Sequence, residues 1–269
     1  MTVRVHEVTA GYGNSPVLIN VSLSVSKGQV CALLGHNGSG KTTLMRCINS
    51  ILQPTRGQIL VMEEDVTRIA RTRIARLISF VPQNSQTAFS FSCLEMILMG
   101  GASRLRMWSS PGPRERKKAR RLCEELGIDH LADLPFNQLS GGQKQLVILT
   151  RALFQETPVM LLDEPTAHLD FGNQHKMMNL VRKLVKQYGV TALITLHDPN
   201  LALNYCDDVI MLKQGRVIAQ GPTHLAFNDS NLREIFGDNI RIEYTNTGAQ
   251  VVVPRFIPQY MPEGKECCT

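Results

Sequence analysis

The sequence predicts an α/β protein with a mostly parallel β-sheet, an antiparallel β subdomain at the N-terminus and an inserted α-helical subdomain. Short aliphatic runs alternate with helical patterns, which favours a parallel sheet covered by helices. Residues 88–155 contain no convincing strand run. The first two runs alternate apolar and polar residues, as the strands of a half-buried antiparallel sheet do.

The strands and the first helix follow from local patterns in chain order. Two N-terminal strands are predicted at VRVHEV and VLINVSLSV, joined by a turn within residues 11–16. The next strand, QVCALL, is continuously apolar, which is typical of a strand buried on both faces. A helix is expected from Lys41 to about Leu52, because Pro54 and Gly57 stop it. Four further strands are predicted at GQILVM, LISFV, PVMLLD and TALITL.

Two hairpins are predicted beyond these elements. DVIMLK and RVIAQG flank Gln-Gly at 214–215, and IRIEY and QVVVP bracket a polar turn. We therefore expect one domain at 1–240, with its core sheet in 1–87 and 156–240 and its helical subdomain at about 88–155. Residues 241–269 are expected to form a short appendage with a hairpin and a tail.

Composition narrows the functional class. No run approaches the roughly 18 apolar residues of a membrane helix, and the N-terminus lacks the pattern of a signal peptide, so a cytosolic protein is expected.

The seven cysteines are scattered without a CxxC pair, which favours buried reduced thiols, and no role is assigned to Cys267 and Cys268. Part of the net charge of +6 lies at 114–121. A solvated helix face explains this run best; a nucleic-acid patch and contact with anionic lipid are the alternatives.

A glycine-rich loop follows the buried strand QVCALL. Residues 35–42 read GHNGSGKT and match GxxxxGK[ST], the pattern of a P-loop NTPase core. The backbone of such a loop turns its N–H groups towards an anion, and the following helix adds its positive end. Lys41 would contact the β- and γ-phosphates, Thr42 would offer its hydroxyl to Mg²⁺, and Thr43 would donate to a phosphate oxygen. A simple glycine turn does not explain the Lys-Thr pair.

Polar residues also follow three other predicted strands. Asp163 ends an apolar run and fits the role of a Mg²⁺ ligand, whereas Glu164 could accept a proton from an attacking water. His197 could hydrogen-bond the γ-phosphate or that water, although a lone histidine is more often structural. Gln83 offers an amide to Mg²⁺ or water, which is a weak signal by itself. Together these residues predict a nucleotide-hydrolysing site.

An LSGGQ segment at 139–143 identifies a family resemblance. With the P-loop, VPQ at 81–83, LLDEP at 161–165, HLD at 168–170 and His197, the sequence resembles ABC ATPases over roughly residues 2–237. Only LSGGQ is specific by itself, but the ordered set leaves little room for chance. His36 stands where the family often has proline, and Pro199 where an aliphatic residue is usual.

The resemblance implies a head-to-tail homodimer that sandwiches two ATP molecules with Mg²⁺. Tyr12 would stack on adenine, the signature residues would cover the partner's γ-phosphate, and Asp170 would lie at the dimer seam. The implied catalytic residues are Glu164, His197, Gln83 and Lys41, and the implied metal ligands are Thr42, Gln83 and Asp163. The implied nucleotide contacts are Tyr12, Gly35, His36, Asn37, Gly38, Ser39, Gly40, Lys41, Thr42, Thr43, Ser140, Gly141, Gly142, Gln143 and Asp170.

A finer resemblance is to the importer ATPases for iron–siderophore complexes, haem and cobalamin, and for the related molybdate or tungstate systems. It rests on IARLISFVPQ, HLDFGNQ, HDPNLAL and GAQVVVPRF. It implies a peripheral protein on the cytoplasmic face of the inner membrane, docked through about 84–108 on two integral membrane permease subunits and, through them, serving a substrate-binding protein. An ATPase of a zinc or manganese importer is the nearest alternative.

A non-transport ABC ATPase acting on nucleic acid or ribosomes is the alternative from another class. Translation-associated members normally carry two cassettes, and this chain has a single P-loop. DNA-repair members insert a long coiled coil, for which 84–138 is far too short. A non-hydrolysing scaffold would be expected to lack Glu164 or His197. No nucleic-acid partner is therefore expected.

Overall fold

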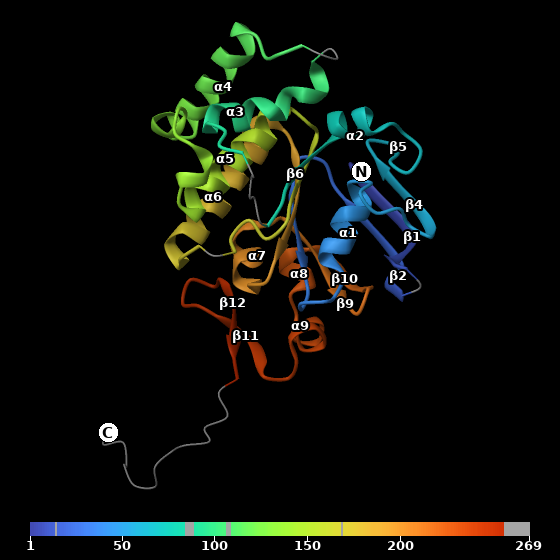
Figure 1. The fold of residues 1–269 in the computed structure, drawn as a ribbon. Coiled ribbons are helices and arrows are strands. Elements are labelled where there is room, and N and C mark those ends of the chain that lie inside the picture. The colour runs from blue at the N-terminus through green and yellow to red at the C-terminus, as the bar shows by residue number, and fades with distance from the viewer. Residues whose placement is uncertain (14, 84–88, 106–108, 168, 256–269) are drawn as a thin grey trace, which may run out of the picture.

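The computed structural model describes residues 1–13, 15–83, 89–105, 109–167 and 169–255. The predicted fold class is confirmed: a mostly parallel sheet, an N-terminal antiparallel sheet and a helical insert are present (Figure 1). Within the described residues, no helix has the length and apolarity needed to cross a bilayer. The expectations for Cys267 and Cys268 fall outside the described residues.

The central sheet has six strands in the order β10-β9-β3-β8-β7-β6. Neighbouring strands from β9 to β6 pair in parallel, and β10 runs antiparallel to β9. The strands are β3 (Val30–Leu34), β6 (Ile78–Val81), β7 (Val159–Leu162), β8 (Thr191–Leu196), β9 (Asp208–Lys213) and β10 (Arg216–Pro222). Because strand residues alternate in direction, Ala32 and Leu34 enter one apolar core and Cys31 and Leu33 enter the other. This explains why the β3 segment is apolar throughout.

The N-terminal antiparallel sheet has the order β2-β1-β4-β5. Its strands are β1 (Val3–Tyr12), β2 (Ser15–Val25), β4 (Arg56–Val61) and β5 (Glu64–Asp65). Alternate residues of β1 and β2 are buried in one core with α1 (Lys41–Ile48) and one face of the central sheet. This sheet therefore encloses α1 and fixes the loop that precedes it.

Helix α1 ends at Ile48, four residues before the predicted end at Leu52. Ser50 adopts a left-handed conformation with φ 52°. The N–H of Ser50 donates to the carbonyl of Cys47, and that of Ile51 donates to Arg46 at 2.8 Å, so the last helical carbonyls are satisfied locally. This pattern usually places glycine where Ser50 stands, which is why the sequence did not reveal the earlier end.

Helices fill the chain between β6 and β7 and cover the second face of the sheet. Helices α3–α5 gather at one end of the molecule, at the top of Figure 1. The insert contains α3 (Cys93–Leu98), η1 (Met99–Arg104), α4 (Pro113–Glu125), η2 (Asp129–Leu131), η3 (Phe136–Gln138) and α5 (Gly141–Phe154). The remaining helices are α2 (Arg71–Leu77), α6 (Phe171–Tyr188), α7 (Pro199–Tyr205), α8 (Thr223–Ala226) and α9 (Asp229–Phe236).

The chain closes with an antiparallel hairpin of β11 (Ile240–Tyr244) and β12 (Gln250–Pro254). In Figure 1 the hairpin lies at the opposite end from α3–α5, directly beside α7. The turn between β9 and β10 holds Gln214 and Gly215 at φ 47° and 75°, which is the conformation of a tight hairpin turn.

The cysteines of the described chain are free and buried at five positions. Burial raises the pKa of Cys47 and of Cys123 to about 11, so both remain protonated thiols at neutral pH. For these five cysteines, the expectation of buried reduced thiols is confirmed.

Candidate functional site

The glycine-rich loop lies at the carboxyl end of β3, between the sheet and α1. A Cβ on Gly35 would fall 2.2 Å from the carbonyl oxygen of Leu212, so only glycine fits there. The Lys41 ammonium donates to the carbonyl of Gly35 at 2.7 Å and to that of His36 at 3.0 Å. Burial lowers the pKa of Lys41 from its ordinary value, and the carboxylates of Glu164 and Asp163 oppose this effect. The loop thus encloses a nearly buried cation.

The start of α1 is open to an anion. Gly40, the residue before the helix, has φ 107° and supplies no side-chain cap to the first N–H groups. A hollow of about 160 Å³ faces this end of the helix. Its lining consists of Val17, Asn37, Gly38, Gly40, Lys41, Thr42, Thr43 and Glu164. Backbone donors, the helix terminus and Lys41 therefore surround a space suited to phosphate groups.

Asp163 and Glu164 directly follow β7 at the same edge of the sheet. Asp163 is 5% exposed, and its Oδ1 accepts a hydrogen bond from the Thr195 hydroxyl at 2.8 Å. The Thr42 hydroxyl lies 3.5 Å from the same Oδ1. A hydroxyl and a carboxylate thus converge beside the hollow, and these are oxygen ligands of the kind that Mg²⁺ prefers. The donor set therefore fits a magnesium ion that also binds phosphate and water.

Glu164 is the centre of the polar contacts at this edge. Its Oε1 lies 2.6 Å from Nε2 of His197, and its Oε2 accepts a hydrogen bond from Nε2 of Gln83 at 2.6 Å. Its backbone has φ 50°, and its N–H donates to the Thr195 hydroxyl at 2.7 Å. The side chain of Glu164 is 15% exposed and that of His197 is 45% exposed. Residues that follow β6, β7 and β8 therefore meet at one carboxylate that also lines the hollow.

Ser140 and Gln143 of the signature segment cap the start of α5. The N–H of Gln143 donates to the Ser140 hydroxyl at 3.3 Å, and the N–H of Ser140 donates back to Gln143 Oε1 at 3.0 Å. A Cβ on Gly141 would meet no atom within 4 Å, so that position faces open space. None of these residues lines the hollow at Lys41. The chain does not bring its own signature segment onto its own phosphate loop.

Two other predicted contact residues also lie apart from the hollow. Tyr12 ends β1 with 49% of its surface exposed, and its hydroxyl accepts a hydrogen bond from Arg46 at 2.8 Å. Asp170 caps α6 by accepting a hydrogen bond from the N–H of Asn173 at 2.9 Å. His168 of the HLD segment lies outside the described residues.

Sequence reasoning missed Thr195. This fully buried hydroxyl in β8 joins the side chain of Asp163 to the backbone of Glu164. A threonine inside an otherwise aliphatic buried strand must find a hydrogen-bond partner, and that was the available signal. The sequence could not identify that partner, because the register of β8 against β7 is decided only when the two strands pair in the folded sheet.

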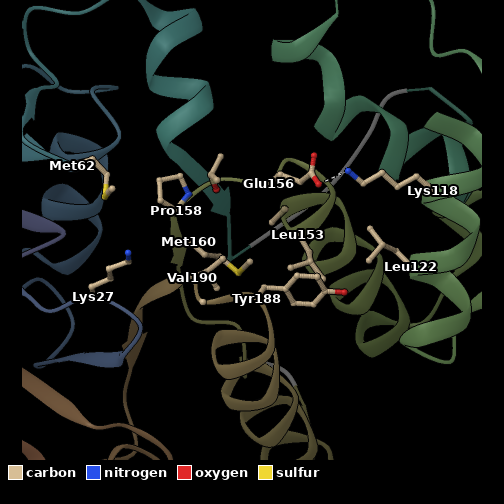
Figure 2. A pocket seen from close by; sticks show the side chains of 13 residues that line it. Lys27, Met62, Lys118, Leu122, Leu153, Glu156, Pro158, Met160, Tyr188 and Val190 are labelled. Atoms are coloured by element: carbon tan, nitrogen blue, oxygen red, sulfur yellow. Dashed lines mark hydrogen bonds and ion pairs between the residues drawn. The ribbon is translucent and has the colours of Figure 1, made fainter. Parts of the chain in front are cut away.

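A larger hollow of about 470 Å³ lies elsewhere, before the starts of β7 and β8 (Figure 2). Apolar side chains such as Leu153, Met160 and Val190 form its walls. Two of its polar groups are already engaged: Lys118 pairs with Glu156, and the Tyr188 hydroxyl donates to Glu125. Burial, together with this hydrogen bond, raises the pKa of Tyr188 to about 12. It contains no residue of the phosphate loop. Chemistry, and not size, therefore identifies the smaller hollow as the candidate site.

Comparison with known proteins agrees with this geometry. Residues 18–167 match the family model "ABC transporter". A "probable iron chelatin transport ATP-binding protein" of Helicobacter pylori is 35% identical over 88% of this chain and 93% of its own length. The hemin import ATP-binding protein HmuV of Rhodococcus jostii is 35% identical over 95% of this chain and 87% of its own. The ferric enterobactin transport ATP-binding protein FepC of Escherichia coli is 31% identical over 93% of both chains.

Solved structures share the fold of this chain. A metal-chelate type ABC transporter in an inward-facing conformation superposes with a TM-score of 0.84 at 27% identity, covering 96% of this chain and 99% of its own. The ADP conformation of the ATP-binding cassette MJ1267 gives 0.78 at 30% identity, covering 87% and 98%. A dimeric structure of the cassette MJ0796 gives 0.72 at 29% identity, covering 82% and 98%.

Proposed function

This chain belongs to the ABC transporter ATP-binding proteins, which hydrolyse ATP to drive transport, and we propose that it is the ATPase subunit of a metal-chelate importer. The observation that carries the proposal is Glu164, which lines the phosphate-sized hollow and contacts both His197 and Gln83. The substrate class we propose is an iron–siderophore, haem or cobalamin complex. Support comes from the iron chelatin, hemin and ferric enterobactin transport proteins among its relatives.

The proposed reaction is an attack of water on the γ-phosphorus of ATP, in which the bond to the β,γ-bridging oxygen breaks and ADP leaves with that oxygen. The phosphates would accept hydrogen bonds from the loop N–H groups, and Lys41 would exchange its loop carbonyls for phosphate oxygens. Thr42 and Asp163 would hold Mg²⁺, which neutralises charge on the β- and γ-phosphate oxygens when bound. Glu164 would accept the proton of the attacking water, while His197 and Gln83 hold its carboxylate in place.

A second copy of the chain would complete each site. In this proposal Ser140, Gly141, Gly142 and Gln143 contact the ATP held by the partner's phosphate loop, and Asp170 lies at the seam. The open space at Gly141 and the exposure of Ser140 and Gly141 at the capped start of α5 support a contact with an external anion. The dimeric structure of a related cassette also supports the arrangement. The active form is thus proposed to be a head-to-tail homodimer with two composite sites.

The proposed setting is the cytoplasmic face of the inner membrane. Two permease subunits would bind the surface within about 84–108, of which 84–88 and 106–108 lie outside the described residues, and would receive substrate from a binding protein. We further propose that residues 1–240 form the ATPase domain and 241–269 an appendage to it. Co-purification with the neighbouring membrane subunits, followed by identification of the bound substrate, tests the substrate class.

The decisive test of the ATPase mechanism is Glu164→Gln. The amide keeps the size of the side chain but cannot take a proton, so hydrolysis should fall by about 100-fold or more. ATP binding should persist, and the variant should accumulate as an ATP-bound dimer in size-exclusion chromatography. Glu156→Gln, beside the larger hollow, is the matched control and should behave as wild type. Unimpaired hydrolysis by Glu164→Gln would show that another group activates the water.

A further inference from the structure

The side chain of Asn200 hydrogen-bonds the C-terminal hairpin to α7. Its Nδ2 donates to the carbonyl of Val252 at 3.0 Å, and its Oδ1 accepts from the N–H of Val252 at 2.9 Å. Val252 lies opposite Ile242 in the hairpin register, yet both of its backbone groups are bonded to Asn200. Neither group can therefore serve the β11–β12 ladder. The Asn200 amide occupies the place of a neighbouring strand along the free edge of β12.

Asn200 stands close to the proposed catalytic residues in the chain. Asp198 caps α7 by accepting a hydrogen bond from the backbone N–H of Asn200 at 2.7 Å. His197 immediately precedes this cap, and its Nε2 lies 2.6 Å from Glu164. Only two residues separate Asn200 from His197, and both belong to the cap or the first turn of α7. A shift of this helix start would therefore move His197 relative to Glu164.

The far end of α7 is held by a different contact. The Tyr205 hydroxyl lies 2.8 Å from Nδ1 of His175 in α6. Loss of the Asn200 contact would leave this end anchored and would release mainly the end beside His197. The hairpin therefore restrains the start of α7, which is the end next to His197.

The same C-terminal segment also contacts the phosphate loop. Phe236, the last residue of α9, packs edge-on against His36 with ring centroids 5.6 Å apart. Helix α9 is bonded to the hairpin, because Asp229 accepts from the N–H of Ile242 at 3.3 Å. Residues 229–254 thus contact the loop after β3 and the first turn of α7, the helix that follows β8, at the lower end of the molecule in Figure 1.

We infer that Asn200 is a positioning residue for ATP hydrolysis: it clamps the C-terminal hairpin to the start of α7 and thereby holds His197 against Glu164. This inference rests on the proposed function. Asn200 lies outside the lining of the phosphate-sized hollow, so its effect concerns the rate of the chemical step and not the affinity for ATP. The role of the C-terminal hairpin is accordingly to fix the position of His197 relative to Glu164 through the start of α7.

The kinetic test weakens the clamp from each side in the full-length chain. Asn200→Ala deletes the amide, and Val252→Pro deletes the N–H that bonds to it while sparing the β11–β12 ladder. Both variants should lower kcat for ATP about tenfold and leave KM within about twofold. Asn204→Ala is the matched control, since its amide donates to the carbonyl of Asn200 within α7, and it should match wild type.

A double-mutant cycle separates positioning from general damage. In a His197→Ala background, measured in single-turnover hydrolysis, Asn200→Ala should cause no further loss. An equal loss in both backgrounds would overturn the inference, because the clamp would then act without His197. An unchanged kcat in both Asn200→Ala and Val252→Pro would also overturn it.

A second readout does not depend on hydrolysis. Carbon–proton correlation spectra of the seven histidines, with the His197 resonance assigned from His197→Ala, report its environment directly. The His197 resonance should shift or broaden in Asn200→Ala and Val252→Pro and stay in place in Asn204→Ala. If the wild-type protein hydrolyses no ATP, the proposed function is contradicted. A His197 resonance that still shifts in the two variants would then support the clamp by itself. An unmoved resonance would overturn the clamp even where hydrolysis is confirmed.

Discussion

The phosphate loop and the signature segment are both glycine-rich and each precedes a helix, but the first is enclosed by the fold and the second is exposed. The loop before α1 is enclosed by the N-terminal sheet, by the ends of the central strands and by Glu164. The segment before α5 is exposed at Ser140 and Gly141, and the Ser140 hydroxyl accepts a hydrogen bond from the N–H of Gln143 in the first turn of the helix. One region is a nearly assembled half-site, and the other is an exposed helix terminus that is capped by its own Ser140.

The difference shows which parts of the nucleotide site a single chain can bring together. Residues that follow parallel strands meet at one sheet edge, so Gln83, Glu164 and His197 converge without any partner. The signature segment lies on the helical insert, away from that edge. Its residues can contact a nucleotide only if something brings one to them, and a second copy of the chain supplies one in the proposed dimer.

Mixing two inactive variants tests the division most strongly. Lys41→Ala should lose ATP binding, and Ser140→Arg should retain binding but block the partner's site, so each alone should show almost no hydrolysis. A mixed dimer contains one intact composite site. An equal mixture should therefore recover about a quarter of wild-type hydrolysis if the sites act independently. No recovery after confirmed subunit exchange would argue against composite sites.

A matched pair of glycine substitutions sharpens the same comparison. Gly35→Ala places a Cβ 2.2 Å from the carbonyl oxygen of Leu212 and should cost about 3 kcal/mol in the free energy of unfolding. Gly141→Ala meets no atom within 4 Å and should leave stability equal or slightly higher. It should still lower hydrolysis about tenfold, because its methyl group would obstruct the partner's ATP. Urea unfolding and steady-state ATPase assays give both values, and a destabilised Gly141→Ala would contradict the contrast.

Thr195→Val probes how the assembled half-site is held together. The substitution removes the hydroxyl that joins Asp163 to the backbone of Glu164, so it should cost about 2 kcal/mol in stability and lower kcat about tenfold. Thr191→Val, at the other end of the same strand, removes a buried hydroxyl that accepts from Gly28 at 3.0 Å. It should lose similar stability and keep its kcat. Equal kcat losses in the two variants would point to general damage of β8.

The smallest effect is expected at Tyr12. Tyr12→Phe removes a hydroxyl bonded to Arg46 at an exposed position, so stability should change by less than about 0.5 kcal/mol and KM for ATP by less than about twofold. Tyr12→Ala should raise KM for ATP about fivefold, since the ring that would stack on adenine is lost. Steady-state ATPase assays measure the KM values of both variants, and urea unfolding measures the stability change. Equal KM values for the alanine variant and wild type would exclude stacking.

Much of the fold was predictable because its signals are local. The buried strands, the tight turn at 214–215 and the loop at 35–42 each depend on neighbouring residues. The end of α1 was not predictable, because Ser50 takes a conformation that usually selects glycine. The links made by Thr195 and Asn200 were also hidden. Their partners are 32 and 52 residues away, and they become partners only through the sheet register and the docking of the hairpin.

By itself, the sequence determined the family, the fold class and the residue types available for binding and hydrolysing ATP, because those properties reside in short motifs and in hydrophobic periodicity. Only the tertiary structure decided which of those residues lie together. It placed His197 and Gln83 on Glu164, left Ser140 and Gly141 facing outward, and joined the C-terminal hairpin to the helix after His197. The physical reason is that these are long-range contacts, which depend on how strands and helices pack and not on any local sequence pattern.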